Sequence, residues 1–482
     1  MKKIYDYLNF KNNFLTHLFW VIIFLIFIKA LLNYDGSKFI YILFSVVFNF
    51  TIYKILFKKT YFFELIFGIL IWLGFWFKFS LFESNIFRSD QIFDGRVFCN
   101  FNLENFDNVL LISSIGCLGF ILSVIFINFF PKFFLEKKEI KYELRKKNFF
   151  FILFILFIFL YSILVISNLA LSIYQKGLLT DNSIFFFTNI IYPYFYNIGF
   201  GAAICFFIYN LHNYNSNLFF YLIAIILLEG FFTNFSMLSR NMILYSLSIF
   251  LGYFVLINKY KQLKIFKYKL FISLFISIFI FLTSIIATNF QRNIKYELID
   301  SDKNEIANFY CENKVNKGYL KDISFLKLLI TRSIGIEGIM VTQMNKNILG
   351  FDLIKQSISE KPNNVKSFYE NKFLNNQKRL RHFKNSNQVI LPGIFGYLFF
   401  AGSKIFLFIS IFSISIFCLT FERVTIFLTN NQILASFLSF CIVWRLVNFG
   451  YLVSNTLNFI ISLIITLLAI YAIQLFLNKN AS

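Results

Sequence analysis

The sequence predicts an all-α membrane protein: a polytopic transmembrane helical bundle of about 12 spans with one large helical extracytoplasmic loop. Three observations lead to this fold class. The 482 residues are 58% hydrophobic and only 15% charged. Apolar runs of roughly 20 residues, the length that crosses a hydrocarbon core, recur along the whole chain. Lys and Arg concentrate between alternate runs, which is typical of loops that remain in the cytoplasm.

The first half of the chain contains six expected spans. Lys2, Lys3 and Lys11 precede the first run and no small-residue cleavage site follows it, so we expect an uncleaved span with its N-terminus inside. Pro193 in the sixth run predicts a kink or a close helix contact. The runs lie at about Phe14–Leu32, Phe39–Phe57, Tyr61–Phe82, Val109–Phe130, Phe149–Leu171 and Ile184–Tyr209.

The second half contains six more runs, interrupted by one long polar segment. They lie at about Leu218–Phe235, Met242–Ile257, Leu270–Ala287, Leu391–Thr420, Ile433–Gly450 and Asn455–Leu477. We therefore divide the chain into spans one to nine (1–288), an extracytoplasmic loop or cap (289–390) and spans ten to twelve (391–482).

Basic residues set the expected orientation in the membrane. The segment between spans four and five gives the strongest cytoplasmic signal, with Lys132, Lys137, Lys138, Lys141, Arg145, Lys146 and Lys147. Five lysines after span eight and Lys479 at the chain end mark the same side. Both termini are then cytoplasmic and the long loop lies outside. The expected location is the bacterial inner membrane.

The long loop is neither featureless nor of low complexity. Apolar spacing predicts an amphipathic helix over Phe325–Met340, with Gly335 and Gly338 indicating a bend or a close backbone approach. Phe351–Ile358 and Val365–Asn376 are expected to form further short helices. Together these helices are expected to form a small cap folded over the membrane face.

The loop is basic on the side where positive charge is usually depleted. Between residues 289 and 387 it carries 17 Lys and Arg against 10 Asp and Glu. An anionic ligand would explain this excess of positive charge, because one guanidinium group, such as that of Arg292 or Arg332, can bind two phosphate oxygens at once. A solvated basic surface that touches anionic lipid headgroups is the alternative.

Charged residues also lie at or near bilayer depth. Arg240 is in the short turn between spans seven and eight, Arg445 is inside span eleven, and Glu229 is inside span seven. Charges at such depth are costly and are usually functional or paired. A structural ion pair between Glu229 and one of the two arginines is the alternative to a ligand site.

These features together resemble one enzyme family. Ser239-Arg240 opens a span, the outer loop carries Arg292 and Arg332, and the chain re-enters the membrane through Leu391-Pro392-Gly393. This arrangement is similar to the Wzy-type O-antigen and oligosaccharide repeat-unit polymerases, which are GT-C-like membrane glycosyltransferases. The resemblance covers about residues 218–471. It implies a polyprenyl-diphosphate-linked oligosaccharide as substrate, with membrane lipid and a chain-length regulator protein as partners.

The resemblance also implies roles for individual residues. A glycan linked to undecaprenyl diphosphate is transferred to a sugar hydroxyl, so arginines would stabilise the diphosphate leaving group. The candidates for diphosphate binding are Arg240, Arg292, Arg332 and Arg445. Glu337, and then His382, are the candidates for the general base. A carboxylate on a helix surface and an exposed loop histidine are the respective alternatives.

Other functions stay open at this point. An O-antigen ligase would share the donor, a lipid-linked sugar flippase would also need many spans and cationic contacts, and a membrane scaffold would need no arginine at depth. A Gly-rich phosphate loop and a large cytoplasmic domain are both missing, so a nucleotide sugar or a nucleic acid is not expected as a ligand.

The six cysteines form neither a CxxC pair nor a zinc-like cluster, so neither metal nor cofactor is expected. Cys99 and Cys311 fall in outer loops and are a candidate disulfide.

Overall fold

The fold is described from a computed structural model of the whole chain. It describes residues 14–57, 61–86, 101, 103–129, 147–175, 188–214, 218–239, 241–259, 263–297, 335–344, 349–359, 392–450 and 453–478.

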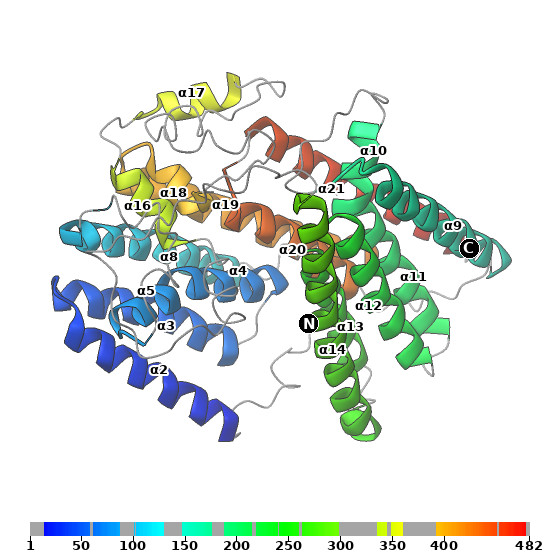
Figure 1. Cartoon of the computed structure of the whole chain (residues 1–482), viewed down its shortest axis with the longest axis horizontal. Helices are drawn as coiled ribbons and strands as arrows, with labels where there is room; N and C mark the ends of the chain where they lie inside the picture. Colours follow the sequence, from blue (N-terminus) through cyan, green and yellow to red (C-terminus); the bar gives the residue numbers. More distant parts are fainter. Residues whose placement is uncertain are drawn as a thin grey trace.

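All the regular elements in the described part of the chain are helices (Figure 1). The first half contains α2 (Phe14–Asn33), α3 (Lys38–Phe57), α4 (Phe62–Trp72), η2 (Leu73–Phe77), α5 (Lys78–Glu83), η3 (Leu103–Asn105), α8 (Phe106–Phe129), α9 (Lys147–Leu171), α10 (Thr188–Tyr194), η5 (Phe195–Gly199) and α11 (Phe200–Tyr214). The second half contains α12 (Phe219–Ser236), α13 (Met242–Lys259), α14 (Leu263–Glu297), α16 (Ile336–Met344), α17 (Asp352–Ser359), α18 (Gly393–Phe399), α19 (Lys404–Thr429), α20 (Gln432–Val447) and α21 (Val453–Asn478).

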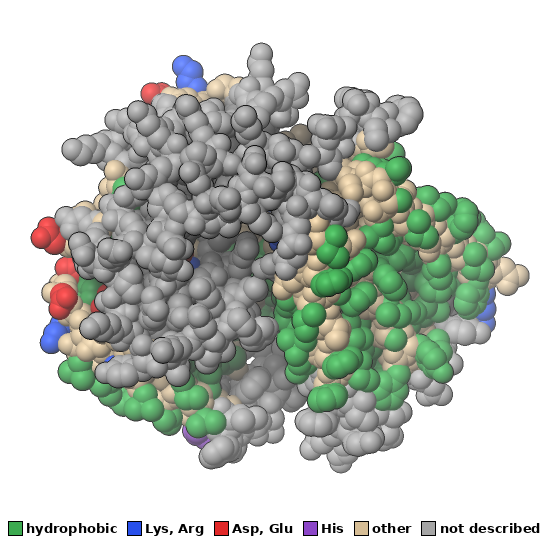
Figure 2. Space-filling view, in the orientation of Figure 1, with side chains coloured by type: hydrophobic (Ala, Val, Ile, Leu, Met, Phe, Trp, Pro, Cys, Tyr) green, Lys and Arg blue, Asp and Glu red, His purple; other side chains and the backbone are tan. Residues whose placement is uncertain are grey.

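The predicted class, an all-α polytopic membrane bundle, is confirmed. In the described residues, ten helices are long and apolar enough to cross a membrane, and Met242–Ile257 and Gln432–Val447 are shorter apolar helices. Many outward-facing side chains of these helices are large and hydrophobic, as contact with lipid requires. Figure 2 shows such side chains covering the right-hand part of the molecule.

The helix pair α19–α20 joins the two halves of the bundle. In Figure 1, α2 to α8 lie on the left and α9 to α14 on the right. α19 packs on α8, while α20 packs on α4 of one half and on α11 and α13 of the other. Asn431, between α19 and α20, caps α20 by accepting from the backbone N–H groups of Ile433 and Leu434 at 3.0 and 3.1 Å. The α19–α20 hairpin therefore forms part of the core of the bundle.

Two spans in the described part of the chain contain a π-helical turn. In the third span, η2 lies between α4 and α5, and in the sixth, η5 lies between α10 and α11. The second turn begins two residues after Pro193, so the span is irregular where a kink or a close helix contact was predicted. Gly201, just after this turn, lies against Phe437, whose ring would be 2.2 Å from an added Cβ. Such turns widen a helix locally and occur frequently at functional sites.

The prediction of a single tenth span from Leu391 to Thr420 is wrong. The structure has a short helix, α18, and then the spanning helix α19, which ends at Thr429. The break has a local cause, because Gly402 has a φ of 74° and Ser403 caps α19 by accepting from Phe406 N at 3.2 Å.

The long loop enters the bundle through α16. Of the helix expected over Phe325–Met340, the structure describes the part from Ile336 onward, which belongs to α16 and follows a bend at Gly335, while residues 325–334 lie outside the described residues. Ile336, Ile339 and Met340 of α16 are fully buried against the bundle, which is deeper than the expected cap. α17 agrees with the helix expected over Phe351–Ile358. The helix expected over Val365–Asn376 lies outside the described residues. We call the end of the bundle that carries α16, α17 and α18 the loop face.

Candidate functional site at the loop face

A buried ion pair joins the long loop to the membrane bundle. Lys78 Nζ lies 2.6 Å from Glu337 Oε1. The Lys78 side chain is 0% exposed and that of Glu337 is 9% exposed. Charged groups with so little access to water require a partner, because the cost of removing each from water is several kcal/mol. The pair is therefore the first candidate for a functional site.

Lys78 is positioned by the π-helical turn of the third span. It begins α5 directly after η2, in a run whose other residues are almost all apolar. Two residues further on, Ser80 Oγ lies 2.9 Å from the hydroxyl of Tyr41, which ties this part of the helix to α3. The extra residue in a π turn rotates the side chains that follow it, so η2 sets the direction of Lys78.

Glu337 is positioned by glycines on either side of it. A Cβ on Gly335 would lie 2.4 Å from the carbonyl oxygen of Gly74 in η2, and one on Gly338 would lie 1.7 Å from that of Pro392. Gly396 of α18 meets the backbone of Gly338 in the same way. These contacts bring α16 against the backbones of η2 and α18, at distances that any side chain would prevent. The carboxylate is thus carried into the bundle to Lys78.

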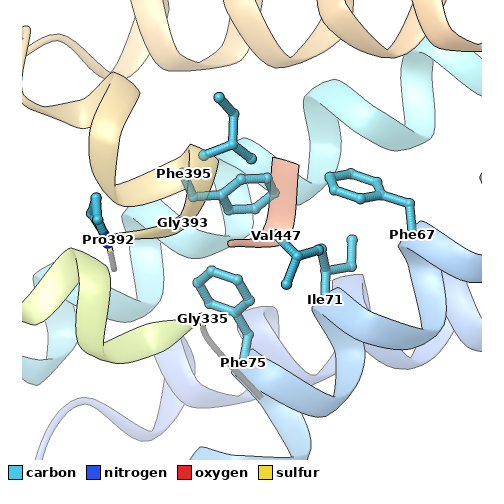
Figure 3. Close-up of a pocket in the computed structure, with 9 residues that line it drawn as sticks. Phe67, Ile71, Phe75, Gly335, Pro392, Gly393, Phe395 and Val447 are labelled. Carbon is cyan, nitrogen blue, oxygen red and sulfur yellow. The ribbon is translucent and has the colours of Figure 1, made fainter. Parts of the chain in front are cut away.

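A small apolar cavity lies beside this contact (Figure 3). The side chains of Phe75, Phe395 and Val447 point toward one another, and the rings of Phe75 and Phe395 are 5.1 Å apart. The cavity has a volume of about 10 Å³, which is the space of about one water molecule. Its complete lining is Phe67, Ile71, Phe75, Gly335, Pro392, Gly393, Ile394, Phe395 and Val447.

Arg445 lies in α20, the helix that also carries Val447 of the cavity, but its side chain is directed toward α21. Its Nε donates to Thr456 Oγ1 at 3.3 Å, and its guanidinium lies 5.7 Å from the centre of the Phe459 ring. Val447, two residues later and roughly 200° around the helix, faces the cavity instead. The structure therefore places Arg445 near the same end of α20 as the site but on another side of that helix.

Glu229 is held by hydroxyl groups. Thr233 Oγ1 donates to its Oε1 at 3.0 Å, and Ser246 Oγ donates to its Oε2 at 3.2 Å. Arg445 lies against Thr456 and Phe459, so it is not the arginine that pairs with Glu229. An ion pair of Glu229 with Arg240 stays a prediction, because Arg240 lies outside the described residues.

Of the remaining candidate site residues, the structure describes Arg292. Arg292 is half-buried in the last turns of α14, a helix that packs on α12 and α13. Arg240, Arg332 and His382 lie outside the described residues, as do Cys99 and Cys311 of the candidate disulfide. Within the described ranges, His, Cys, Asp and Glu side chains form no group of three that could hold a metal ion.

Sequence reasoning missed Lys78 and a second charged cluster at the opposite end of the bundle. Glu422 accepts from the backbone N–H groups of Phe62 and Phe63 at 2.8 and 2.7 Å, and Arg423 donates to the carbonyl oxygen of Ile127 at 3.0 Å. Lys78 lies within the third apolar run, and the rule that singled out Arg445, a charge inside a span, would have found it. Glu422 and Arg423 lie just beyond the predicted end of the tenth run and fall inside a span only because α19 continues to Thr429.

Comparison of the chain with protein-family models, with curated proteins and with solved structures finds no significant match.

Proposed function

We propose that the protein is an inner-membrane glycosyltransferase that polymerises oligosaccharide repeat units linked to undecaprenyl diphosphate. The observation that carries this proposal is the Lys78–Glu337 pair, in which a loop helix brings a carboxylate into the bundle at the loop face. A charged pair buried within a membrane bundle is by default a functional site. The basic balance of residues 289–387 supports an anionic, lipid-linked ligand.

Glu337 is the proposed general base. The hydroxyl of the acceptor sugar gives its proton to the Glu337 carboxylate as its oxygen bonds to the anomeric carbon of the donor. The bond from that carbon to the diphosphate oxygen breaks, and its electron pair leaves on the lipid diphosphate. Lys78 acts as a positioning residue, because its ammonium group holds the carboxylate at 2.6 Å.

Arginines are proposed to bind the diphosphate and to stabilise its developing charge. Arg292 near the end of α14 and Arg445 near the end of α20 are the described members of this group. Arg240 and Arg332 as further diphosphate contacts, and His382 as the second candidate base, stay predictions. In this proposal both termini are cytoplasmic and the loop face is outside.

A lipid-linked sugar flippase is the second candidate. It is favoured by α16 and α18, two short helices that pack on each other and are buried among the spans. Transporters build their substrate sites from such short or discontinuous helices.

A rescue experiment in the host organism tests the proposal. The gene is deleted and surface polysaccharide is resolved by gel, with wild-type protein and the variants Glu337→Gln, Arg292→Ala and Arg332→Ala supplied in turn. We expect deletion to remove the long-chain ladder and to leave a single capped repeat unit, and the variants to fail to restore the ladder. Glu104→Gln, an exposed carboxylate, is the control and should rescue.

Other outcomes separate the alternatives. Lipid-linked polymer that accumulates without reaching the surface would indicate a ligase. Single lipid-linked repeat units retained on the cytoplasmic side would indicate a flippase. A glycan profile unchanged by deletion would contradict every glycan function.

A further inference from the structure

We propose that α16 is a lid on the loop-face site and that the structure shows its closed state. The identity of the ligand that opens it rests on the proposed function, but the docking of the lid does not. The first observation is access. Lys78 is completely buried and the adjacent cavity has a volume of only about 10 Å³, so no sugar or phosphate can reach the ion pair while α16 is in place.

The contacts of α16 are suited to withdrawal as a unit. Around Glu337 they are made by backbone, since Gly335 meets Gly74 and Gly338 meets Pro392 and Gly396. No glycine side chain interlocks with η2 or α18 at these points, and the hydrogen bond from Thr342 Oγ1 of α16 to the carbonyl oxygen of Gly396, at 3.1 Å, breaks when α16 withdraws. α16 also belongs to the loop, because its nine residues are flanked by the polar segments that connect α14 to α18.

Two kinds of interaction favour the closed state. Ile336, Ile339 and Met340 are fully buried and leave the core if α16 withdraws. The Lys78–Glu337 pair adds specificity, because a buried charge without its partner is strongly unfavourable. Binding of a ligand that competes for Lys78 or Glu337 would shift the population toward the open state.

Thiol labelling in reconstituted vesicles tests the lid. Met340→Cys is the reporter in a background without the six native cysteines, and Phe351→Cys, whose side chain is 82% exposed, is the reference. We expect Met340→Cys to label much more slowly than Phe351→Cys. Lys78→Met removes the ammonium group that pairs with Glu337 and should speed labelling at position 340 about a hundredfold, since labelling follows the open population.

A matched variant controls for the loss of charge. Lys78→Met combined with Glu337→Met removes both charges, and an apolar pair of similar volume is tolerated in buried positions. Slow labelling should therefore return in the double variant. Equal labelling of Met340→Cys and Phe351→Cys in the otherwise native protein, or no effect of Lys78→Met, would overturn the lid.

Undecaprenyl diphosphate added to the vesicles tests the gating role. We expect it to increase labelling of Met340→Cys, whereas the phospholipid phosphatidylglycerol, which carries one phosphate, should not. No response to the diphosphate lipid would overturn the gating role even if Lys78→Met opens the lid. Failure of the proposed function would appear differently, as missing polymer from a protein whose lid opens normally.

Discussion

At the scale of single residues, several of the buried charges have a specific partner. Lys78 and Glu337 pair with each other at the loop face, and Glu229 accepts hydrogen bonds from two hydroxyl groups. At the opposite end of the bundle, Glu422 takes the place of an N-cap residue for α4, which is why Tyr61 before that helix needs no capping side chain of its own. The charged residues thus hold helix ends and loop segments in register inside an apolar bundle.

Glu422 is predicted to be important for stability. Glu422→Ala would leave the first backbone N–H groups of α4 and the Ser439 hydroxyl without their acceptor, and Arg423 without its neighbouring carboxylate. We expect the free energy of unfolding to fall by about 3 kcal/mol or more. Denaturation of the purified protein in detergent, followed by helical circular dichroism, measures this change. Glu104→Ala should change stability by less than about 0.5 kcal/mol, and an equally small effect of Glu422→Ala would refute the capping role.

Residue-scale features divide into those that the sequence can and cannot predict. A charge inside an apolar run is visible in the sequence, so Lys78 could have been found, whereas Glu422 and Arg423 lie beyond the predicted end of the tenth run at Thr420. The partner of each charge is not, because Lys78 and Glu337 are separated by many spans and meet only in the folded bundle. Arg445 illustrates the difference, since its depth was predicted but its direction toward α21 was not.

At the scale of elements, the contacts of α16 depend on glycine. Gly338→Ala would place a methyl group 1.7 Å from the Pro392 carbonyl oxygen, a position that backbone atoms cannot vacate cheaply. We expect α16 to be displaced and a Met340→Cys reporter to label nearly as fast as Phe351→Cys. The control is Gly350→Asn, because Gly350 has a φ of 55° that Asn tolerates and an added Cβ there would meet no described atom within 4 Å. Slow labelling in Gly338→Ala would contradict the close backbone packing.

Elements with a long apolar run were predicted well from sequence. The last span, expected at Asn455–Leu477, is found at those residues, and Pro193 correctly indicated the irregular sixth span. The tenth span was wrong because hydropathy does not register a break of a few residues such as that at Gly402 and Ser403. The insertion of α16 was missed because nine residues are too few to resemble a span, even though Gly335 and Gly338 indicated close backbone contact.

At the scale of the whole molecule, the α19–α20 hairpin and the long loop complete the bundle together. α20 lies between the two halves, and α18 joins the hairpin to α16 and so to Glu337. Gly393 N donates to the carbonyl oxygen of Phe449 at 2.9 Å, which ties the start of α18 to the turn after α20. This arrangement cannot be read from periodicity, because it depends on contacts between distant segments. It explains how an extended loop can present one carboxylate at a defined position.

The most direct test of the central claim is a reaction with purified components. Protein in vesicles is incubated with an undecaprenyl-diphosphate-linked repeat unit isolated from the host strain, and the products are separated by size. We predict chains of increasing length with the native protein and with Glu104→Gln. The Lys78→Met, Glu337→Met variant, which removes the proposed base without leaving a buried charge unpaired, should form none. Polymer formation by this variant at the native rate would contradict the role of Glu337, and the absence of polymer with the native protein would contradict the proposed function itself.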